Sequence, residues 1–125
     1  MNAQEISYKL LKILSQDANL TQREIAKRIG ISLGKANYCL SALAQKGFIK
    51  IQRFNESKTK FRYLYMLTPK GIEEKARLTI RFFKYKLKEY EQIKRQIDEL
   101  SLEIEKDQLS DVEAITSEEE LRSIV

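Results

Sequence analysis

The sequence predicts a mainly α-helical chain with one small β-hairpin, and three observations support this fold class. Apolar residues recur at helical spacing in three short segments before Gly47. Two segments rich in aromatic and branched residues, 48–54 and 61–67, follow and are separated by a polar stretch. From Ile72 to about Ile104 no proline or glycine intervenes, which indicates one long C-terminal helix. The 125 residues leave room for one compact domain and an appendage.

The first two helices are predicted from apolar spacing and from a cap. The apolar stripe of the first helix, predicted over residues 3–15, consists of Ile6, Leu10, Ile13 and Leu14. Residues 21–24 read Thr-Gln-Arg-Glu, a capping box in which the Thr21 hydroxyl and the Glu24 carboxylate each accept from the other residue's backbone N–H. A second helix is therefore expected from about Thr21 to Gly30, where a left-handed glycine ends it. Its core-facing residues are Leu20, Ile25, Ala26 and Ile29.

The third and fourth helices also have recognisable starts. Ile31 and Ser32 form a turn, and Ser32 is the expected N-cap of a third helix that ends at Gly47. Its buried face comprises Ala36, Leu40, Leu43 and Ala44. Thr68 is the expected cap of the long helix, and Pro69 fits its first turn, where the missing N–H costs nothing.

Three short helices followed by a basic hairpin are typical of a winged helix-turn-helix, in which the third helix enters the major groove of DNA. The charge distribution agrees with this interpretation. Residues 1–70 contain 13 Lys and Arg against 4 Asp and Glu, a net +9, whereas residues 105–125 contain 2 against 7, a net −5. A basic head of this kind attracts polyanions and gains affinity by displacing counterions from DNA.

The exposed side of the third helix is the expected base-reading surface, the complement of its buried face. Lys35 can donate to guanine or phosphate, Asn37 offers the donor and acceptor that adenine requires, and Tyr38 can reach a phosphate or a thymine methyl. Gly34 would let the backbone approach the DNA closely. The alternative is that these are ordinary solvated positions. The full set is Ser32, Leu33, Gly34, Lys35, Asn37, Tyr38 and Ser41.

Two further groups are expected to contact the DNA backbone. Residues on or beside the hairpin tip would act as a wing on phosphate or in the minor groove, namely Arg53, Asn55, Ser57, Lys58, Lys60 and Arg62. At the start of the second helix, Thr21 and Gln22 could hold a phosphate through backbone N–H groups and the helix dipole. For Thr21, a cap with no further role is an equal alternative.

The long helix carries a coiled-coil seam, with Lys86 at the heptad position where its register is imperfect. The seam comprises Phe83, Leu87, Tyr90, Ile93, Ile97, Leu100 and Ile104. So small a head cannot bury this stripe, so we expect a homodimer through the C-terminal helix, with Phe82 and Tyr85 also in its core. The predicted domains are residues 1–68, a DNA-binding domain; 69–104, a dimerisation helix; and 105–125, an acidic flexible tail.

The composition argues against an enzyme. The sequence has no histidine, no glycine-rich phosphate loop and no clustered metal-ligand spacing, so we expect no catalytic residue, cofactor or metal. Cys39 is the sole cysteine, which excludes an intramolecular disulfide and suits a reducing cytoplasm; a small buried thiol is its expected state. No apolar run approaches the roughly 18 residues of a membrane span, and residues 1–14 lack a signal-peptide cleavage site. A cytoplasmic protein without membrane contact is expected.

Several segments resemble a known family over about residues 4–104. These are TQREIAKRIGISLGKANYCLSALAQKGFIK, NESKTK, LTPKGIEEKARLT and the helix ending in KEYEQIKRQIDEL. They are similar to the MarR-type regulators associated with exopolysaccharide (EPS) gene clusters. The resemblance implies groove contacts for residues 32–38 and a wing tip at residues 55–60. Larger MarR proteins have an extra N-terminal helix that helps to form the dimer and an effector crevice, and this sequence begins near the first winged-helix element. Dimerisation is therefore expected to depend on the C-terminal helix, and the resemblance leaves a small-molecule effector unknown.

The expected function is that of a dimeric, sequence-specific transcriptional regulator of double-stranded DNA, a repressor rather than an activator. Two alternatives remain at the level of the sequence. One is a winged-helix adaptor that docks proteins, which would bind DNA negligibly. The other is a sequence-neutral architectural DNA-binding protein, which would bind cognate and random duplexes equally.

Overall fold

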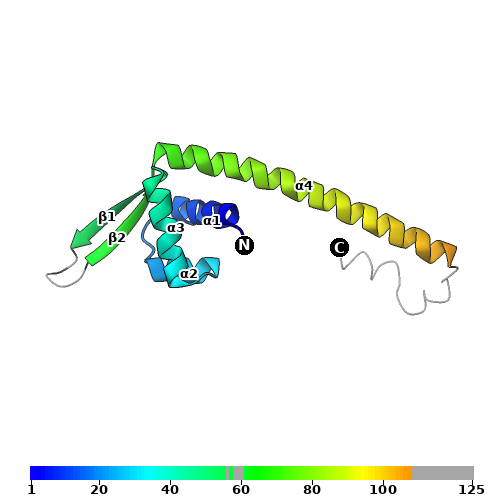
Figure 1. The fold of residues 1–125 in the computed structure, drawn as a ribbon, viewed down its shortest axis with the longest axis horizontal. Coiled ribbons are helices and arrows are strands. Elements are labelled where there is room, and N and C mark those ends of the chain that lie inside the picture. Colours follow the sequence, from blue (N-terminus) through cyan, green and yellow to red (C-terminus); the bar gives the residue numbers. More distant parts are fainter. Residues whose placement is uncertain (56, 58–60, 108–125) are drawn as a thin grey trace. The chain divides into compact units, whose positions relative to one another are not determined.

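The computed structural model describes residues 1–55, 57 and 61–107, and over these residues it confirms the predicted fold class. The elements run in the order α1 (Ala3–Gln16), α2 (Gln22–Ile29), α3 (Leu33–Gln45), β1 (Ile49–Asn55), β2 (Phe61–Leu67) and α4 (Pro69–Lys106) (Figure 1). Three helices, a two-stranded hairpin and a long C-terminal helix make up a winged helix-turn-helix with an extension. The chain divides into two units, a head of Met1–Phe82 and a second unit that begins at Phe83, so α4 contributes to both.

Side-chain caps fix where the three short helices begin. The Thr21 hydroxyl accepts from the Glu24 N–H at 3.2 Å, and the Ser32 hydroxyl accepts from the Lys35 N–H at 3.1 Å, as predicted. Asn2 caps α1 in the same way, accepting from the Glu5 N–H at 2.9 Å. The capping box differs in its second half, because the Glu24 carboxylate accepts from the Thr21 hydroxyl at 3.0 Å.

The core of the head is apolar and draws on all three short helices, the base of the hairpin and α4. All the residues predicted to face it from α2 and the preceding loop are buried. The prediction for α1 was wrong in one respect: Leu11 is 0% exposed, whereas Ile13 is only partly buried. The buried cluster is Ile6, Leu10, Leu11, Leu14, Leu20, Ile25, Ile29, Leu40, Leu43, Ile49, Tyr65 and Leu78. Burying each Leu or Ile contributes roughly 1.5–3 kcal/mol, so this cluster stabilises the head.

The hairpin is antiparallel, and its register runs from Ile49 opposite Leu67 to Asn55 opposite Phe61. In β1 only Ile49 is buried, and the rest of the strand is exposed. The strand begins one residue later than predicted because Phe48 belongs to a joint: its N–H donates to the Leu43 carbonyl, and its own carbonyl accepts from the Thr68 N–H. The hairpin is thus fixed at its base and leads away from the core (Figure 1).

The joint between the hairpin and α4 is held by Thr68. Its hydroxyl donates to the Gly47 carbonyl at 2.5 Å and accepts from the Gly71 N–H at 3.0 Å. Gly71 is buried against Phe48, and a Cβ at this position would collide with the Phe48 carbonyl oxygen. The absence of a side chain at Gly71 therefore sets how closely α4 approaches Phe48 at the base of the hairpin.

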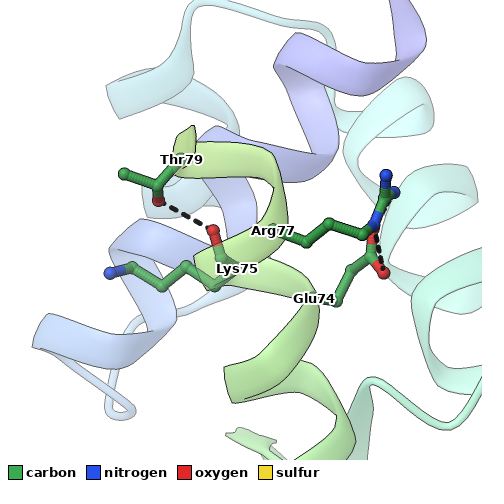
Figure 2. A network of polar contacts seen from close by, with 4 residues as sticks. All are labelled: Glu74, Lys75, Arg77 and Thr79. Carbon is green, nitrogen blue, oxygen red and sulfur yellow. Dashed lines mark hydrogen bonds and ion pairs between the residues drawn. The ribbon is translucent and has the colours of Figure 1, made fainter. Parts of the chain in front are cut away.

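The first turns of α4 belong to the head. Leu78 is buried in the core, and the ring of Phe82 lies 5.4 Å from that of Tyr8, tilted by 51°. Phe82, which was expected in a dimer core, thus packs against the core of its own head, where it is partly buried. Figure 2 shows polar contacts along this stretch: Arg77 donates from Nε and Nη2 to the Glu74 carboxylate, and the Thr79 hydroxyl donates to the Lys75 carbonyl at 2.7 Å. The bond and charge of Glu74 raise the pKa of Arg77 above its ordinary value.

From Phe83 onward, α4 carries apolar side chains with large exposed surfaces. Every residue of the predicted seam is exposed in the single chain, as are Tyr85 and Leu102. Ile72 and Ile80, earlier in α4, are exposed as well and were not part of the predicted seam. Over the described residues, no helix combines the length and apolarity needed to cross a membrane. Most of the acidic tail, residues 108–125, lies outside the described residues.

Candidate nucleic-acid interface

The turn between α2 and α3 holds the two helices in a fixed relation. Gly30 adopts a left-handed conformation with φ 82°, which an L side chain would strain. The N–H groups of Gly30 and Ile31 both donate to the Ala26 carbonyl, at 2.9 and 3.0 Å, and satisfy the end of α2. Ser32 then caps α3 immediately, so the chain reverses within three residues and starts the third helix.

Helix α3 has one buried and one exposed face, as the sequence predicted. Ala36, Leu40 and Leu43 are 0–3% exposed and anchor it to the core. All seven residues predicted to read bases are exposed; Leu33 retains 42% and Tyr38 76% of its surface. Within the described chain, the side chains of Lys35, Asn37 and Tyr38 have no hydrogen-bond or ion-pair partner. Their donors and acceptors are therefore available to a ligand.

Cys39 lies between these two faces. It is a free thiol of intermediate burial that packs against the core cluster. This agrees with the expectation of a small core-side cysteine.

The wing residues are only partly brought together. Arg53, Asn55 and Ser57 are exposed, whereas Lys58 and Lys60 lie outside the described residues. Arg62 is half-buried, and its Nη2 donates to the Asn19 carbonyl at 2.6 Å. Arg62 thus lies beside the hairpin tip, one residue into β2, and its side chain also connects β2 to the loop between α1 and α2.

The side chain of Gln22 is engaged inside the head. Its Nε2 donates to the Leu33 carbonyl at 3.3 Å, and its Oε1 accepts from the Tyr65 hydroxyl at 3.4 Å. Gln22 therefore connects the start of α2 to the first turn of α3 and to β2. The first intrahelical bond of α2 runs from the Ile25 N–H to the Thr21 carbonyl. The backbone N–H groups of Gln22 and Arg23 come before it, so they have no acceptor within the helix.

A recess of about 340 Å³ opens where α2, α3 and β2 meet. It brings together the predicted phosphate contacts Thr21 and Gln22 with Leu33 and Arg62, and adds three residues that the sequence did not single out, Arg23, Tyr63 and Tyr65. A signal for each was present: Arg23 follows Gln22 in the first turn of α2, and Tyr63 and Tyr65 share one face of β2. The lining is Thr21, Gln22, Arg23, Leu33, Arg62, Tyr63 and Tyr65.

Tyr65 is the recess residue with a shifted ionisation. Burial, and secondarily the neighbouring Tyr63, raise the pKa of the Tyr65 hydroxyl above its ordinary value of 10.0. The hydroxyl therefore stays neutral at physiological pH and can donate to Gln22.

A second, smaller recess of about 230 Å³ lies between α1 and α2. Three cationic side chains surround it, Lys9, Lys12 and Arg28, above the apolar Ile13 and Ile29. Lys9 is turned toward the N-terminus, where its Nζ lies 3.0 Å from the Met1 sulfur. This recess adds positive charge to the head.

Comparison with known proteins identifies the first part of the head. Residues 4–50 match the family described as winged helix-turn-helix DNA-binding. The match spans α1, α2 and α3 and ends just inside β1. This segment is a winged helix-turn-helix DNA-binding domain. A search of curated proteins gives no match.

Solved structures extend the likeness to most of the chain. MepR, a transcription regulator of the Staphylococcus aureus multidrug efflux pump MepA, is 24% identical with a TM-score of 0.55, covering 90% of this chain and 79% of its own. A mutant of S. aureus MepR bound to an oligodeoxyribonucleotide is 22% identical with a TM-score of 0.55, covering 83% of this chain and 79% of its own. The PcaV transcriptional regulator from Streptomyces coelicolor, in complex with its natural ligand, is 22% identical with a TM-score of 0.56, covering 74% of this chain and 72% of its own. At these identities the likeness establishes a shared fold, which is that of MarR-family regulators.

Proposed function

We propose that this chain is a transcriptional regulator of the MarR family that binds specific double-stranded DNA sequences as a homodimer and represses transcription. One observation supports this above the others: α3 is anchored by a fully apolar face, while its opposite face presents unpartnered polar side chains to solvent. A helix held in this way can enter a major groove without losing any interaction of its own. A dimer seated over a promoter would exclude polymerase sterically.

Base reading is assigned to the exposed face of α3. In this proposal Asn37 pairs with adenine, Lys35 donates to guanine or phosphate, and Tyr38 contacts a thymine methyl or phosphate. Ser32, Leu33 and Gly34 lie at the N-terminal end of the helix, which in helix-turn-helix proteins comes nearest to the bases. Ser41, one turn further along, would mark the limit of the contact.

Contacts to the sugar-phosphate backbone are assigned to the wing and to the start of α2. Arg53, Asn55 and Ser57 are exposed along the hairpin, and the sequence places Lys58 and Lys60 at its tip. Replacing either lysine is expected to weaken binding to all sequences and to reduce its salt dependence, whereas replacing a base-reading residue changes sequence preference. Residues 1–70 contain 13 Lys and Arg against 4 Asp and Glu, and this positive charge supports phosphate contacts from this part of the chain.

The dimer is assigned to the seam of α4. Its seven apolar residues retain 40–64% of their surface in the single chain, which is costly for a helix in water. Pairing with a second copy would bury them in coiled-coil fashion. We therefore assign residues 1–68 to DNA binding, 69–104 to dimerisation and 105–125 to an acidic tail, with the operator predicted to be a pseudo-palindrome.

The experiment that tests the proposal is selection of binding sites from a random duplex library with the purified protein, followed by footprinting. We expect an enriched pseudo-palindrome whose half-sites lie about one helical turn, roughly 10 bp, or a multiple of it apart. Equal affinity for enriched and random duplexes would identify an architectural binder instead. Negligible DNA binding at physiological salt would identify a protein-docking adaptor. Repression is tested separately, by placing the selected site over the promoter of a reporter gene.

Two finer assignments belong to the same proposal. The segments ISLGKANYCLSAL and LTPKGIEEKARLT favour the exopolysaccharide-associated branch of the MarR family. The sole cysteine, a free thiol, suits the reducing cytoplasm in which such a regulator would meet DNA.

A further inference from the structure

The recess between α2, α3 and β2 has the composition of an anion site. Arg23 is exposed and has no hydrogen-bond or ion-pair partner among the described residues. Arg62 contributes a second guanidinium, and Tyr63, which is 47% exposed, contributes a phenol. Among the residues that the structure describes, no carboxylate lines the recess; the nearby Glu24 carboxylate accepts from the Thr21 hydroxyl.

The backbone adds to this positive potential. The first turns of α2 and of α3 both line the recess, through Gln22 and Arg23 on one side and Leu33 on the other. First-turn N–H groups of a helix have no intrahelical acceptor and carry the positive end of its dipole. Two helix starts and two arginine side chains therefore meet at one concave surface.

We propose that this recess binds one DNA backbone phosphate in each half-site, with Arg23 and the Tyr63 hydroxyl as its side-chain donors. The inference rests on the proposed function, because Leu33 belongs both to the recess and to the base-reading face, so DNA on that face passes the recess. The Gln22 side chain acts as a positioning residue: by bonding Leu33 and Tyr65 it holds the three walls of the recess together. The phosphate would fix the register of α3 on the duplex without reading sequence.

The first experiment measures affinity against salt concentration for Arg23→Ala on the selected operator and on a random duplex. Removing one phosphate contact should make the negative slope of log binding constant against log salt concentration shallower by about 0.9. It should also weaken binding about fivefold at 0.15 M salt. The loss should be the same on both duplexes. Arg28→Ala is the matched control, an exposed arginine in the last turn of the same helix that lines only the second recess, and its slope should stay near the wild-type value.

The second experiment locates the contact by ethylation of individual phosphates. We expect one phosphate in each half-site whose ethylation weakens binding of the wild type but not of Arg23→Ala, since that variant has already lost the interaction. Tyr63→Phe should reproduce part of the effect with the fold unchanged. An unchanged salt slope for Arg23→Ala, or an ethylation pattern identical to that of the wild type, overturns the proposal.

A third arm distinguishes a DNA phosphate from a free one. Inorganic phosphate is titrated into the DNA-free protein while the amide signals of Gln22 and Arg23 are followed by NMR. If inorganic phosphate binds there and Arg23→Ala abolishes that binding while DNA affinity is unchanged, the recess is a site for free phosphate and the DNA proposal is wrong. Failure of the proposed function looks different, because the wild-type protein itself would then show no preferred duplex.

Discussion

At the scale of single residues, the availability of donors and acceptors separates the side chains that can read DNA from those that maintain the fold. Lys35 and Asn37 have no partner within the described chain, whereas Gln22 and Arg62 are engaged with Leu33, Tyr65 and Asn19. All four are polar residues near the same surface. The side chains of the first pair make no bond inside the head, whereas those of the second pair already connect elements of the head.

Asn37→Ala is expected to relax sequence preference, because it weakens binding to the selected operator while leaving affinity for random duplexes largely unchanged. The variant loses the paired donor and acceptor that distinguish adenine, which is worth about 1–3 kcal/mol of discrimination. Competition between the selected operator and duplexes changed at one position measures this loss. Gln45→Ala, at the exposed C-terminal end of α3, is the control and should retain wild-type discrimination. Equal loss of affinity on all sequences would assign Asn37 to the phosphate backbone instead.

The raised pKa of Tyr65 predicts a loss of stability at alkaline pH. Because the folded state holds the phenolic proton more tightly than the unfolded state, this contribution is complete below pH 10 and falls as the pH rises from there through the folded pKa. Urea unfolding of the wild type and of Tyr65→Phe at a series of pH values measures it. The variant should show a flatter decline above pH 10, whereas Tyr63→Phe, at the more exposed phenol, should retain most of the wild-type slope.

At the scale of elements, two glycines differ in what their missing side chains permit. Gly71 lies in the first turn of α4 against the Phe48 carbonyl, so the hairpin and α4 can meet only if this position has no Cβ. Gly34 lies in the first turn of α3, and a Cβ there would meet nothing within 4 Å. The first glycine therefore serves the fold, and the second leaves open space on the face of α3 that we propose reads DNA.

Gly71→Ala is expected to lower the free energy of unfolding by about 1–3 kcal/mol, because the added methyl group forces α4 away from the joint. Gly34→Ala should instead raise it by about 0.5–1 kcal/mol through higher helix propensity. Chemical denaturation measures both. If Gly34→Ala also weakens operator binding while stabilising the protein, close approach of DNA at this position is supported. Unchanged stability in Gly71→Ala would show that the joint can shift without cost.

At the scale of the whole molecule, the second unit carries an apolar face that the single chain leaves in water. The seam residues repeat at alternating spacings of three and four from Tyr90 to Ile104, which is the pattern of two helices paired side by side. Leu102 is equally apolar but falls outside that pattern. The chain thus supplies its own comparison between a seam leucine and a non-seam leucine on one helix.

Leu100→Asp is expected to convert the dimer to a monomer, since a carboxylate cannot be buried unpaired in the seam. Leu102→Asp introduces the same charge two residues away, at a leucine of similar exposure (56% against 58%), and should leave the dimer intact. Sedimentation equilibrium gives the oligomeric state of each. Footprinting of Leu100→Asp should show weaker protection without two-fold symmetry. A dimeric Leu100→Asp would place the interface elsewhere than on this seam.

The sequence by itself determined the type and order of the elements, the caps of α2, α3 and α4 and the two faces of α3. Each of these features depends on residues close together in the chain: Ser32 caps the helix it precedes, and Ala36, Leu40 and Leu43 share a face through helical periodicity alone. The same reasoning named the exposed side chains of α3 correctly. Their assignment to base contacts stays a prediction.

Only the tertiary structure decided which residues meet across elements. Arg62 reaches Asn19 and Tyr65 reaches Gln22 across 43 positions of sequence, so the side chains of Arg62 and Gln22 also hold parts of the head together. The packing of α1 buries Leu11 more deeply than Ile13, and the docking of α4 turns Phe82 toward Tyr8. Such contacts depend on how helices and strands pack against one another, and helical or strand periodicity carries no information about the partner on the other side.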